Sequence, residues 1–259
     1  MSQNKDILSQ HISHWRAIQS TILNRNMEHM VNKNYRYYCY KLGTVNKLFV
    51  FLTALVPDEY LLNPQYFQWG QFSQEFLDRH HCMFLRDVNN FYYMHTSSIQ
   101  LQRLETICLI EYHRMNINIP RENVIIVGCS AGATAAIDIS ALGQYGKCVA
   151  FSAQTDFEMD LDLLGKYDET YRPRFEIEKN IIQLGYYPNL LPSFHLSSAE
   201  SRFFLIWGQY NKIDNEIHTD LQNRLHNNKN VFFIPVNTDD HNSAGNCDRL
   251  SIKQLLTEG

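Results

Sequence analysis

Ser130 lies between Gly128 and Gly132 at the end of an apolar run. The run, Val124–Val127, predicts a buried strand, and the small residues that follow predict a helix over Ala131–Leu142. The pattern G-x-S-x-G between a strand and a helix is that of a nucleophile elbow, a tight turn that lifts a serine hydroxyl above the sheet. The flanking residues must be small because the strand and the helix approach closely. The alternative is a glycine-rich turn that binds a phosphate or only packs, although the P-loop lysine and the G-x-G-x-x-G pattern are both absent.

A nucleophilic serine needs a base within hydrogen-bond reach and an acid that orients the base. At an elbow of this kind the chain order is serine, then aspartate or glutamate, then histidine. Asp214 follows the apolar run Phe203–Trp207, and His241 follows Val231–Val236. Reactive groups gather where parallel strands end, so we expect both side chains to meet Ser130 at that edge of the sheet.

Other residues compete for these two roles. Asp156 and Glu216 are alternative acids, and Asp214 could instead cap a helix that starts near Glu216. The alternative bases are His195, which lies in a long insert, and His218 and His226, which fall in a helical pattern. A surface histidine is the simplest interpretation of each.

The oxyanion of a tetrahedral intermediate needs two hydrogen-bond donors. The N–H of Ala131, directly after the serine, is the expected first donor. The second should come from the loop after Lys47–Leu52, where Thr53 and Ala54 are the candidates. This loop lacks the usual histidine-glycine pair, so Thr53 could equally be an ordinary strand end.

The elements that must position these residues follow from the apolar pattern. Strands are predicted at Tyr35–Tyr40, Lys47–Leu52, His81–Arg86, Val124–Val127, Cys148–Ser152, Phe203–Trp207 and Val231–Val236, and helices at Ser98–Met115, Ala131–Leu142, Glu216–His226 and Ser251–Leu256. Most of the strand runs do not alternate, which is typical of strands buried on both faces of a parallel sheet. The sequence therefore predicts an α/β fold with a mostly parallel sheet of about seven strands and helices on both faces.

Local patterns add detail to this fold. The first two runs are joined by KLGTVN, short enough for a hairpin. In the helix Ser98–Met115, one amphipathic stripe is predicted to contain Leu101, Leu104, Cys108 and Tyr112.

The chain divides into two predicted parts. Residues 1–30 carry an accessory helix from Lys5 to about Asn26, with its apolar residues roughly on one face. Residues 31–259 form the α/β domain. The segment 155–201 is too long for a simple crossover, which indicates a cap-like insert over the carboxyl ends of the strands.

Composition excludes several classes. The formal net charge is −4 and the chain has no basic stripe, so we expect no nucleic-acid partner. No apolar stretch reaches the length of a membrane helix, and the first residues do not resemble a signal peptide, so a cytoplasmic location is expected. The six cysteines form no C-x-x-C pair, which favours small core residues in a reducing compartment over disulfides or a metal site.

Taken together, the stretch VIIVGCSAGATAAI, the Asp214 loop and the His241 loop resemble the α/β-hydrolase superfamily, from about Tyr35 to the end of the chain. Within it, FLRDVNNFYY, GCSAGATAAI and VAFSAQTDF resemble a bacterial group that includes capsule polysaccharide O-acetyltransferases and accessory secretion proteins. The chain departs from the pattern at Ala133, where glycine is frequent, before Gln154, where a proline is expected, and in the oxyanion loop, which lacks a clear glycine.

The resemblance implies acyl transfer through an acyl-serine intermediate. Hydrolysis of a small ester would need no cofactor. The alternative is an O-acetyltransferase that moves acetyl from acetyl-CoA to a bacterial capsular or surface polysaccharide, and both use the same three residues. A third possibility, from another class, is a catalytically silent scaffold that binds a glycan or a protein. The oligomeric state is not predicted.

Overall fold

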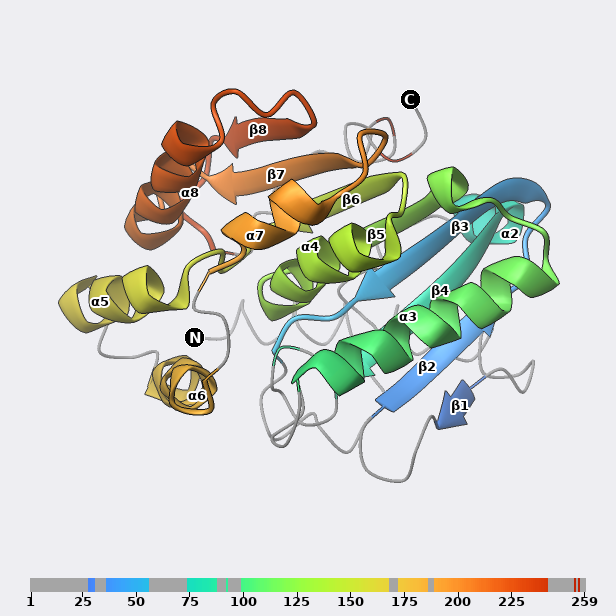
Figure 1. The fold of residues 1–259 in the computed structure, drawn as a ribbon, viewed down its shortest axis with the longest axis horizontal. Helices are drawn as coiled ribbons and strands as arrows, with labels where there is room; N and C mark the ends of the chain where they lie inside the picture. The colour runs from blue at the N-terminus through green and yellow to red at the C-terminus, as the bar shows by residue number, and fades with distance from the viewer. Residues whose placement is uncertain are drawn as a thin grey trace, which may run out of the picture.

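The computed structural model describes residues 28–30, 36–55, 74–87, 92, 99–167, 172–185, 189–241, 254 and 256. In this part of the chain one sheet holds eight strands in the order β1-β2-β4-β3-β5-β6-β7-β8 (Figure 1). Their bounds are β1 Glu28–Met30, β2 Arg36–Lys41, β3 Val45–Leu52, β4 His80–Asp87, β5 Val124–Cys129, β6 Lys147–Phe151, β7 Arg202–Gly208 and β8 Val231–Val236. Six neighbouring strands are parallel to one another, namely β4, β3, β5, β6, β7 and β8. At the remaining edge, β2 pairs antiparallel with β4, and β1 pairs antiparallel with β2. The predicted α/β fold with a mostly parallel sheet is confirmed.

The predicted hairpin between the first two long strands is wrong. Strand β4 lies between β2 and β3, antiparallel to the first and parallel to the second. The short loop between β2 and β3 crosses the start of β4, where the Thr44 N–H donates to Arg79 O at 2.8 Å. A Cβ on Gly43 would lie 2.2 Å from the His80 carbonyl carbon, so this crossing requires a glycine.

Helices surround the sheet. They are α2 Gln74–Arg79, α3 Ile99–Asn116, α4 Ala131–Gly143, α5 Phe157–Tyr167, α6 Arg172–Gln183, α7 Leu191–Leu196 and α8 Lys212–Arg224, with a 3-10 turn at Arg121–Asn123. Figure 1 shows α3, α4 and α7 side by side in front of the sheet. Helix α4 packs against α3 and α7 as well as against β5 and β6. Among the described residues, no helix is long and apolar enough to cross a membrane.

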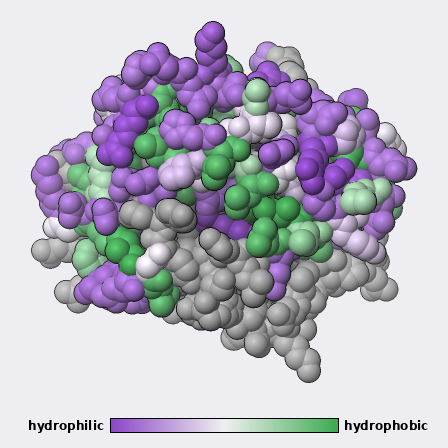
Figure 2. All heavy atoms as spheres, in the orientation of Figure 1, coloured by the Kyte–Doolittle hydropathy of each residue, from purple (hydrophilic) through white to green (hydrophobic). Residues whose placement is uncertain are grey.

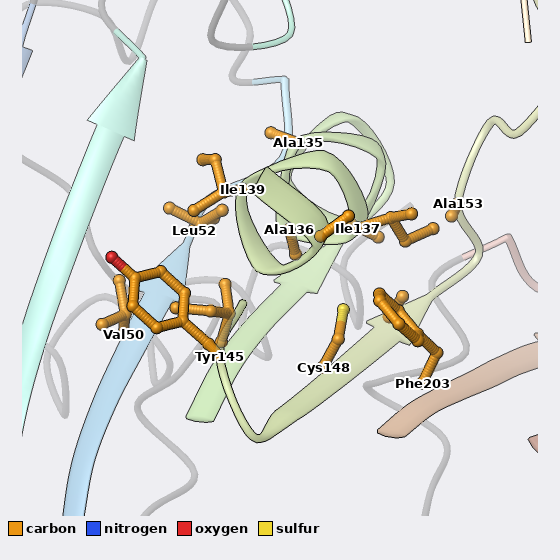
Figure 3. Close-up of a cluster of buried hydrophobic side chains, with 14 of the residues drawn as sticks. Val50, Leu52, Ala135, Ala136, Ile137, Ile139, Tyr145, Cys148, Ala153 and Phe203 are labelled. Carbon is orange, nitrogen blue, oxygen red and sulfur yellow. The ribbon is translucent and has the colours of Figure 1, made fainter. Parts of the chain in front are cut away.

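Strand β3 shows why the apolar runs do not alternate. Leu48, Val50 and Leu52 belong to the core cluster under α4, while Phe49 and Phe51 belong to the cluster on the other face. All five are fully buried. Figure 3 shows the first cluster, in which α4 lies on the sheet beside side chains of β3, β6 and β7. Both faces of the central strands are therefore covered, as expected for a parallel sheet.

The cysteines of the central strands are core residues. Cys82, Cys129 and Cys148 are buried, whereas Cys108 on α3 is exposed. Because small apolar residues fill the space between closely packed elements, the three buried thiols act as packing groups in the sheet.

Helix α3 occurs where it was expected, but three residues of its predicted apolar stripe, Leu104, Cys108 and Tyr112, face solvent. Leu104 is 51% exposed, Tyr112 is 62% exposed, and the buried side instead holds Arg103, Thr106 and Ile110. Arg103 forms a buried ion pair with Asp138 of α4. The face of α3 that packs on α4 is therefore of mixed polarity. It can include Arg103 because the ion pair with Asp138 offsets the cost of burying the charge. Figure 2, in the same orientation, shows several hydrophobic patches on an otherwise hydrophilic surface.

The segment 155–201 contains α5, α6 and α7. Helix α7 packs on α4, and α5 packs on both α6 and α8. Helices α5 and α6 also reach the elbow, since Phe157 and Ile181 share a buried cluster with Tyr92 and Ala131. The predicted helix from Lys5 to about Asn26 lies outside the described residues, and that at Ser251–Leu256 lies mostly outside them; Glu28–Met30, at the end of the predicted accessory segment, joins the sheet as β1.

Candidate active site

Ser130 occupies a strained turn between β5 and α4. Its φ is 52° and its ψ is −123°, a conformation that costs free energy in any residue except glycine. A Cβ on Gly128 would lie 2.2 Å from Gly132 O, and a Cβ on Gly132 would lie 2.5 Å from the carbonyl oxygens of both Leu52 and Thr53. Strand, helix and the neighbouring strand end therefore meet with no room for a side chain, as the glycine pattern predicts.

The three residues expected to cooperate are in contact. Ser130 Oγ lies 2.9 Å from His241 Nε2. On the other side of the ring, His241 Nδ1 lies 2.8 Å from Oδ1 and 3.0 Å from Oδ2 of Asp214. A carboxylate only accepts hydrogen bonds, so the ring proton belongs on Nδ1 and Nε2 is left to accept from the serine hydroxyl. This geometry allows the imidazole to take the serine proton while the carboxylate holds the ring.

The environment of Asp214 favours its charged form. Burial, the largest single influence, opposes ionisation, but the adjacent and hydrogen-bonded His241, together with smaller contributions from His218 and Arg174, outweighs it and lowers the pKa of the carboxyl below its usual value. Asp214 also lies in the first turn of α8, where the helix dipole favours a negative charge. The carboxylate is thus available to stabilise an imidazolium at His241.

The acid and base loops are joined by hydrogen bonds. The Asn211 side chain accepts from the Asp214 N–H at 3.0 Å, and its Nδ2 donates to Asp239 O at 3.2 Å. The Tyr210 N–H donates to Thr238 O at 3.0 Å. Asn211 is therefore the cap of α8, which begins at Lys212 rather than near Glu216 as the sequence predicted. The interpretation of Asp214 as the cap is wrong.

Gly208 is a residue of this region that the sequence analysis missed. A Cβ there would lie 2.8 Å from Thr238 O and 2.9 Å from Asp240 O. The loop before His241 thus passes directly over the end of β7, and only a glycine leaves it room. A glycine that ends an apolar strand just before the candidate acid was the available signal.

The competing acids and bases have other contacts. Asp156 accepts from the Met159 N–H at 3.0 Å, near the start of α5. His226 Nδ1 donates to Asn223 O, and His195 lines a surface groove of about 380 Å³. His218 Nδ1 donates to the backbone oxygen of Asp214 at 2.8 Å. Among the described residues, only Asp214 and His241 of these candidates form the chain of hydrogen bonds that ends at Ser130.

His218 is a buried neutral group behind the acid. Its ring stacks on Trp207 with centroids 4.9 Å apart, and burial lowers its pKa. Within the described part of the chain its Nε2 has no hydrogen-bond partner. His218 therefore supports the backbone of Asp214 through Nδ1.

The predicted oxyanion donors differ in their surroundings. Ala131 is the first residue of α4, and the first N–H groups of a helix have no partner within the helix. The Thr53 N–H donates to Leu85 O at 3.3 Å and so continues the ladder between β3 and β4. Of the two candidates for the second donor, Thr53 loses support and Ala54 remains a prediction.

A buried polar cluster ties the insert together beside the elbow. Arg174 of α6 pairs with Glu178 at 2.9 Å and with Asp160 of α5, and the Tyr92 hydroxyl donates to Glu178. Burial first, and then the neighbouring Asp160, raise the pKa of Glu178 well above its usual value. Because Tyr92 also packs in the cluster that holds Ala131, α5 and α6 are held next to the serine.

Gln154, which follows β6, is another residue whose position the sequence analysis did not foresee. Its side chain is buried and lies against both Ser130 and His241. Among the described residues, no three histidine, cysteine or acidic side chains gather in a way that could hold a metal ion.

Comparison with solved structures identifies the fold. The capsule O-acetyltransferase of Neisseria meningitidis serogroup A has a TM-score of 0.66 at 15% identity, over 90% of this chain and 99% of that one. A variant of that enzyme in complex with CoA has a TM-score of 0.62 at 13% identity, over 89% and 94% of the two chains. A carboxylesterase of Nitrososphaera gargenis has a TM-score of 0.56 at 12% identity, over 88% and 96%. No family model and no curated protein sequence matches the chain. The chain has the α/β-hydrolase fold.

Proposed function

We propose that the protein is a serine-dependent enzyme that cleaves carboxylic esters through an acyl-serine intermediate. The observation that carries the proposal is the chain of hydrogen bonds from Ser130 Oγ through His241 to Asp214, which starts at a strained elbow. An intact chain of this kind argues against a silent scaffold, because a binding module has no need of it.

The proposed reaction has two halves. In the first, His241 Nε2 takes the proton of Ser130 while Oγ bonds to the ester carbonyl carbon, and Asp214 stabilises the imidazolium. The oxyanion accepts from the Ala131 N–H at the positive end of α4. The proton then passes from His241 to the leaving oxygen as its bond to the acyl carbon breaks. In the second half, a hydroxyl gives its proton to His241 as it attacks the acyl carbon, and His241 then passes the proton to Ser130 Oγ as the bond between Oγ and the acyl carbon breaks.

A second candidate differs only in the acyl donor and in what accepts the acyl group. Acetyl-CoA would be the donor and a hydroxyl of a bacterial capsular or surface polysaccharide the acceptor. The similarity to a capsule O-acetyltransferase over nearly the whole of both chains, including a structure in complex with CoA, supports this candidate. In either case we propose that α5 and α6 form a cap beside Ser130, since both contribute to the buried cluster around Ala131. We further propose a cytoplasmic location, where the buried thiols would stay reduced.

The first experiment tests the nucleophile. The wild type and Ser130→Ala are incubated with a fluorophosphonate probe and with p-nitrophenyl acetate. Ser140→Ala, which alters a buried serine on the same helix, is the matched control. Labelling and hydrolysis should be lost only in Ser130→Ala. Absence of labelling in the wild type, or labelling that survives the substitution, would contradict the proposal.

The second experiment separates the two candidates. The protein is incubated with acetyl-CoA, with and without a capsular polysaccharide, and release of free CoA is followed together with O-acetyl signals on the glycan. CoA release that depends on the glycan, with acetyl groups appearing on it, would favour the transferase. Ester hydrolysis at equal rates with and without any acceptor, and no use of acetyl-CoA, would favour the esterase.

A further inference from the structure

Gln154 contacts both the proposed nucleophile and its base. Its Oε1 lies 3.5 Å from Ser130 Oγ, and its Nε2 lies 3.3 Å from His241 Nε2. The side chain is 1% exposed, so these contacts are made away from solvent. A buried primary amide beside a nucleophile is a polar group that requires an explanation.

The orientation of the amide follows from its partners. Nε2 lies 2.8 Å from the Ser152 carbonyl oxygen, which can only accept, so the nitrogen end must be there. Oε1 lies 3.5 Å from the hydroxyl oxygens of both Ser130 and Thr134, on the side of the amide away from the Ser152 carbonyl. One N–H of Gln154 is therefore used by Ser152, and the second points toward His241 Nε2.

The backbone around Gln154 holds it firmly. The Gln154 N–H donates to Thr134 Oγ1 at 3.0 Å, and Thr134 Oγ1 donates to Gln154 O at 3.1 Å. Ser152 has a φ of 50°, a second strained position at the end of a strand, and this turn brings its carbonyl oxygen under the amide. Strain of this kind persists only where the surrounding structure enforces it, and it gathers at functional sites.

We propose that Gln154 is a catalytic residue that donates its second N–H to the oxygen atom exchanged at the acyl carbon. The inference rests on the proposed function and adds a residue to it. At rest, that N–H and the Ser130 hydroxyl both face the same lone pair of His241 Nε2. Once Nε2 takes the serine proton it becomes a donor, so the amide N–H must turn to another acceptor.

The leaving oxygen is that acceptor, because His241 must also point at it to deliver the proton. In the first half of the reaction the bond between acyl carbon and leaving oxygen breaks, the proton passes from His241 to that oxygen, and Gln154 stabilises its developing charge. In the second half the attacking hydroxyl gives its proton to His241. Its oxygen attacks the acyl carbon with one lone pair and accepts the Gln154 N–H with the other. The Gln154 N–H bonds remain intact throughout.

The test uses the dependence of rate on the leaving group. A good leaving group such as p-nitrophenolate needs little stabilisation, whereas an alkoxide needs more. In Gln154→Met, which keeps the length but removes the donor, acylation by p-nitrophenyl acetate and fluorophosphonate labelling should stay within about threefold of the wild type, while turnover of an alkyl acetate and deacylation fall about 10- to 100-fold. Gln154→Asn, which keeps an amide on a shorter side chain, should show the same selective loss.

Thr134→Val tests the anchor of Gln154. It removes the hydroxyl that holds the Gln154 backbone and keeps the shape of the side chain, so it should displace the amide and reproduce the same selective loss in weaker form. If the Gln154 variants slow all substrates by a similar factor, or lose nothing, Gln154 is structural and the inference is overturned while the proposed function stands. A wild type that neither labels nor hydrolyses any ester overturns both.

Discussion

The fit of Gly132 at the elbow leads to a quantitative prediction for Gly132→Ala. The added Cβ would lie 2.5 Å from two backbone oxygens, those of Leu52 and Thr53. Real Cβ atoms keep at least 3.0 Å, so the end of β3 and the start of α4 must separate by at least 0.5 Å. Both partners are backbone atoms within a fully buried region, so no flexible side chain can absorb the change.

The expected cost has two parts. Overpacking of a core typically costs about 1–3 kcal/mol, and the better helix propensity of alanine offsets about 1 kcal/mol of this. A net loss of up to about 2 kcal/mol would lower the Tm by up to about 8 °C in a chain of this size. Because a misplacement of about 1 Å costs about a hundredfold in rate, a half-ångström shift beside Ala131 should slow fluorophosphonate labelling about 10-fold.

Gly165→Ala is the matched control for this substitution. Gly165 also lies within a helix, α5, but a Cβ there would meet no atom within 4 Å. The same chemical change should therefore stabilise the protein by about 0.5–1 kcal/mol and leave labelling unchanged. Thermal denaturation and the labelling rate are measured on both variants. A Gly132→Ala protein with the Tm and labelling rate of the wild type would refute the close packing on which the elbow depends.

Three further substitutions test the rest of the site. Asp214→Asn removes the acceptor for His241 Nδ1 and should lower kcat for ester hydrolysis about 10²- to 10⁴-fold with little change in the circular dichroism spectrum; a loss below threefold would contradict the orienting role. Gly208→Ala should push the loop before His241 outward by a few tenths of an ångström and slow labelling about threefold, and an unchanged rate would show that the loop has room to spare. The pKa of buried His218 is lowered, so the unfolded chain takes up a proton below pH 6.5 that the folded chain does not, and stability falls as the pH drops from 6.5 by at most about 1.4 kcal/mol per unit from this group. In His218→Phe the urea-unfolding free energy should fall less steeply between about pH 6.5 and 5, and parallel curves would exclude His218 as a source of the loss.

The parts of the structure that depend on local pattern were predictable. A buried parallel strand needs a continuous apolar run, and a tight strand-to-helix turn needs small residues, so β5, Ser130 and α4 could be located from adjacent residues. The loops of Asp214 and His241 could be located because polar residues directly follow apolar runs.

The parts of the structure that depend on contacts between distant segments of the chain could not be predicted. Nothing within KLGTVN reveals that β4 will lie between β2 and β3, because that pairing is decided by strands elsewhere in the chain. The exposed stripe of α3 illustrates the same limit, since its buried face depends on an ion pair between Arg103 and Asp138 on another helix. The start of α8 was misplaced because Asn211, which caps the helix, also bonds to a loop that arrives later in the sequence.

The order of the sheet explains why these particular loops meet. Ser130 follows β5, Gln154 follows β6, Asp214 follows β7 and His241 follows β8, and these four strands are consecutive neighbours. Parallel strands lie about 4.8 Å apart, so β5 and β8 are separated by roughly 14 Å. The contact of 2.9 Å between Ser130 Oγ and His241 Nε2 therefore requires the His241 loop to turn back across the ends of β7 and β6.

That return path accounts for two features that otherwise look unrelated. The loop crosses the end of β7 at Gly208, where any side chain would collide with it. It then reaches the end of β6, where the strained turn at Ser152 places the Gln154 amide next to the imidazole of His241. A bulkier side chain at that point would keep the imidazole away from Ser130. The proposed nucleophile alone needs only its own turn, but bringing the proposed base to it from three strands away constrains the end of every strand in between.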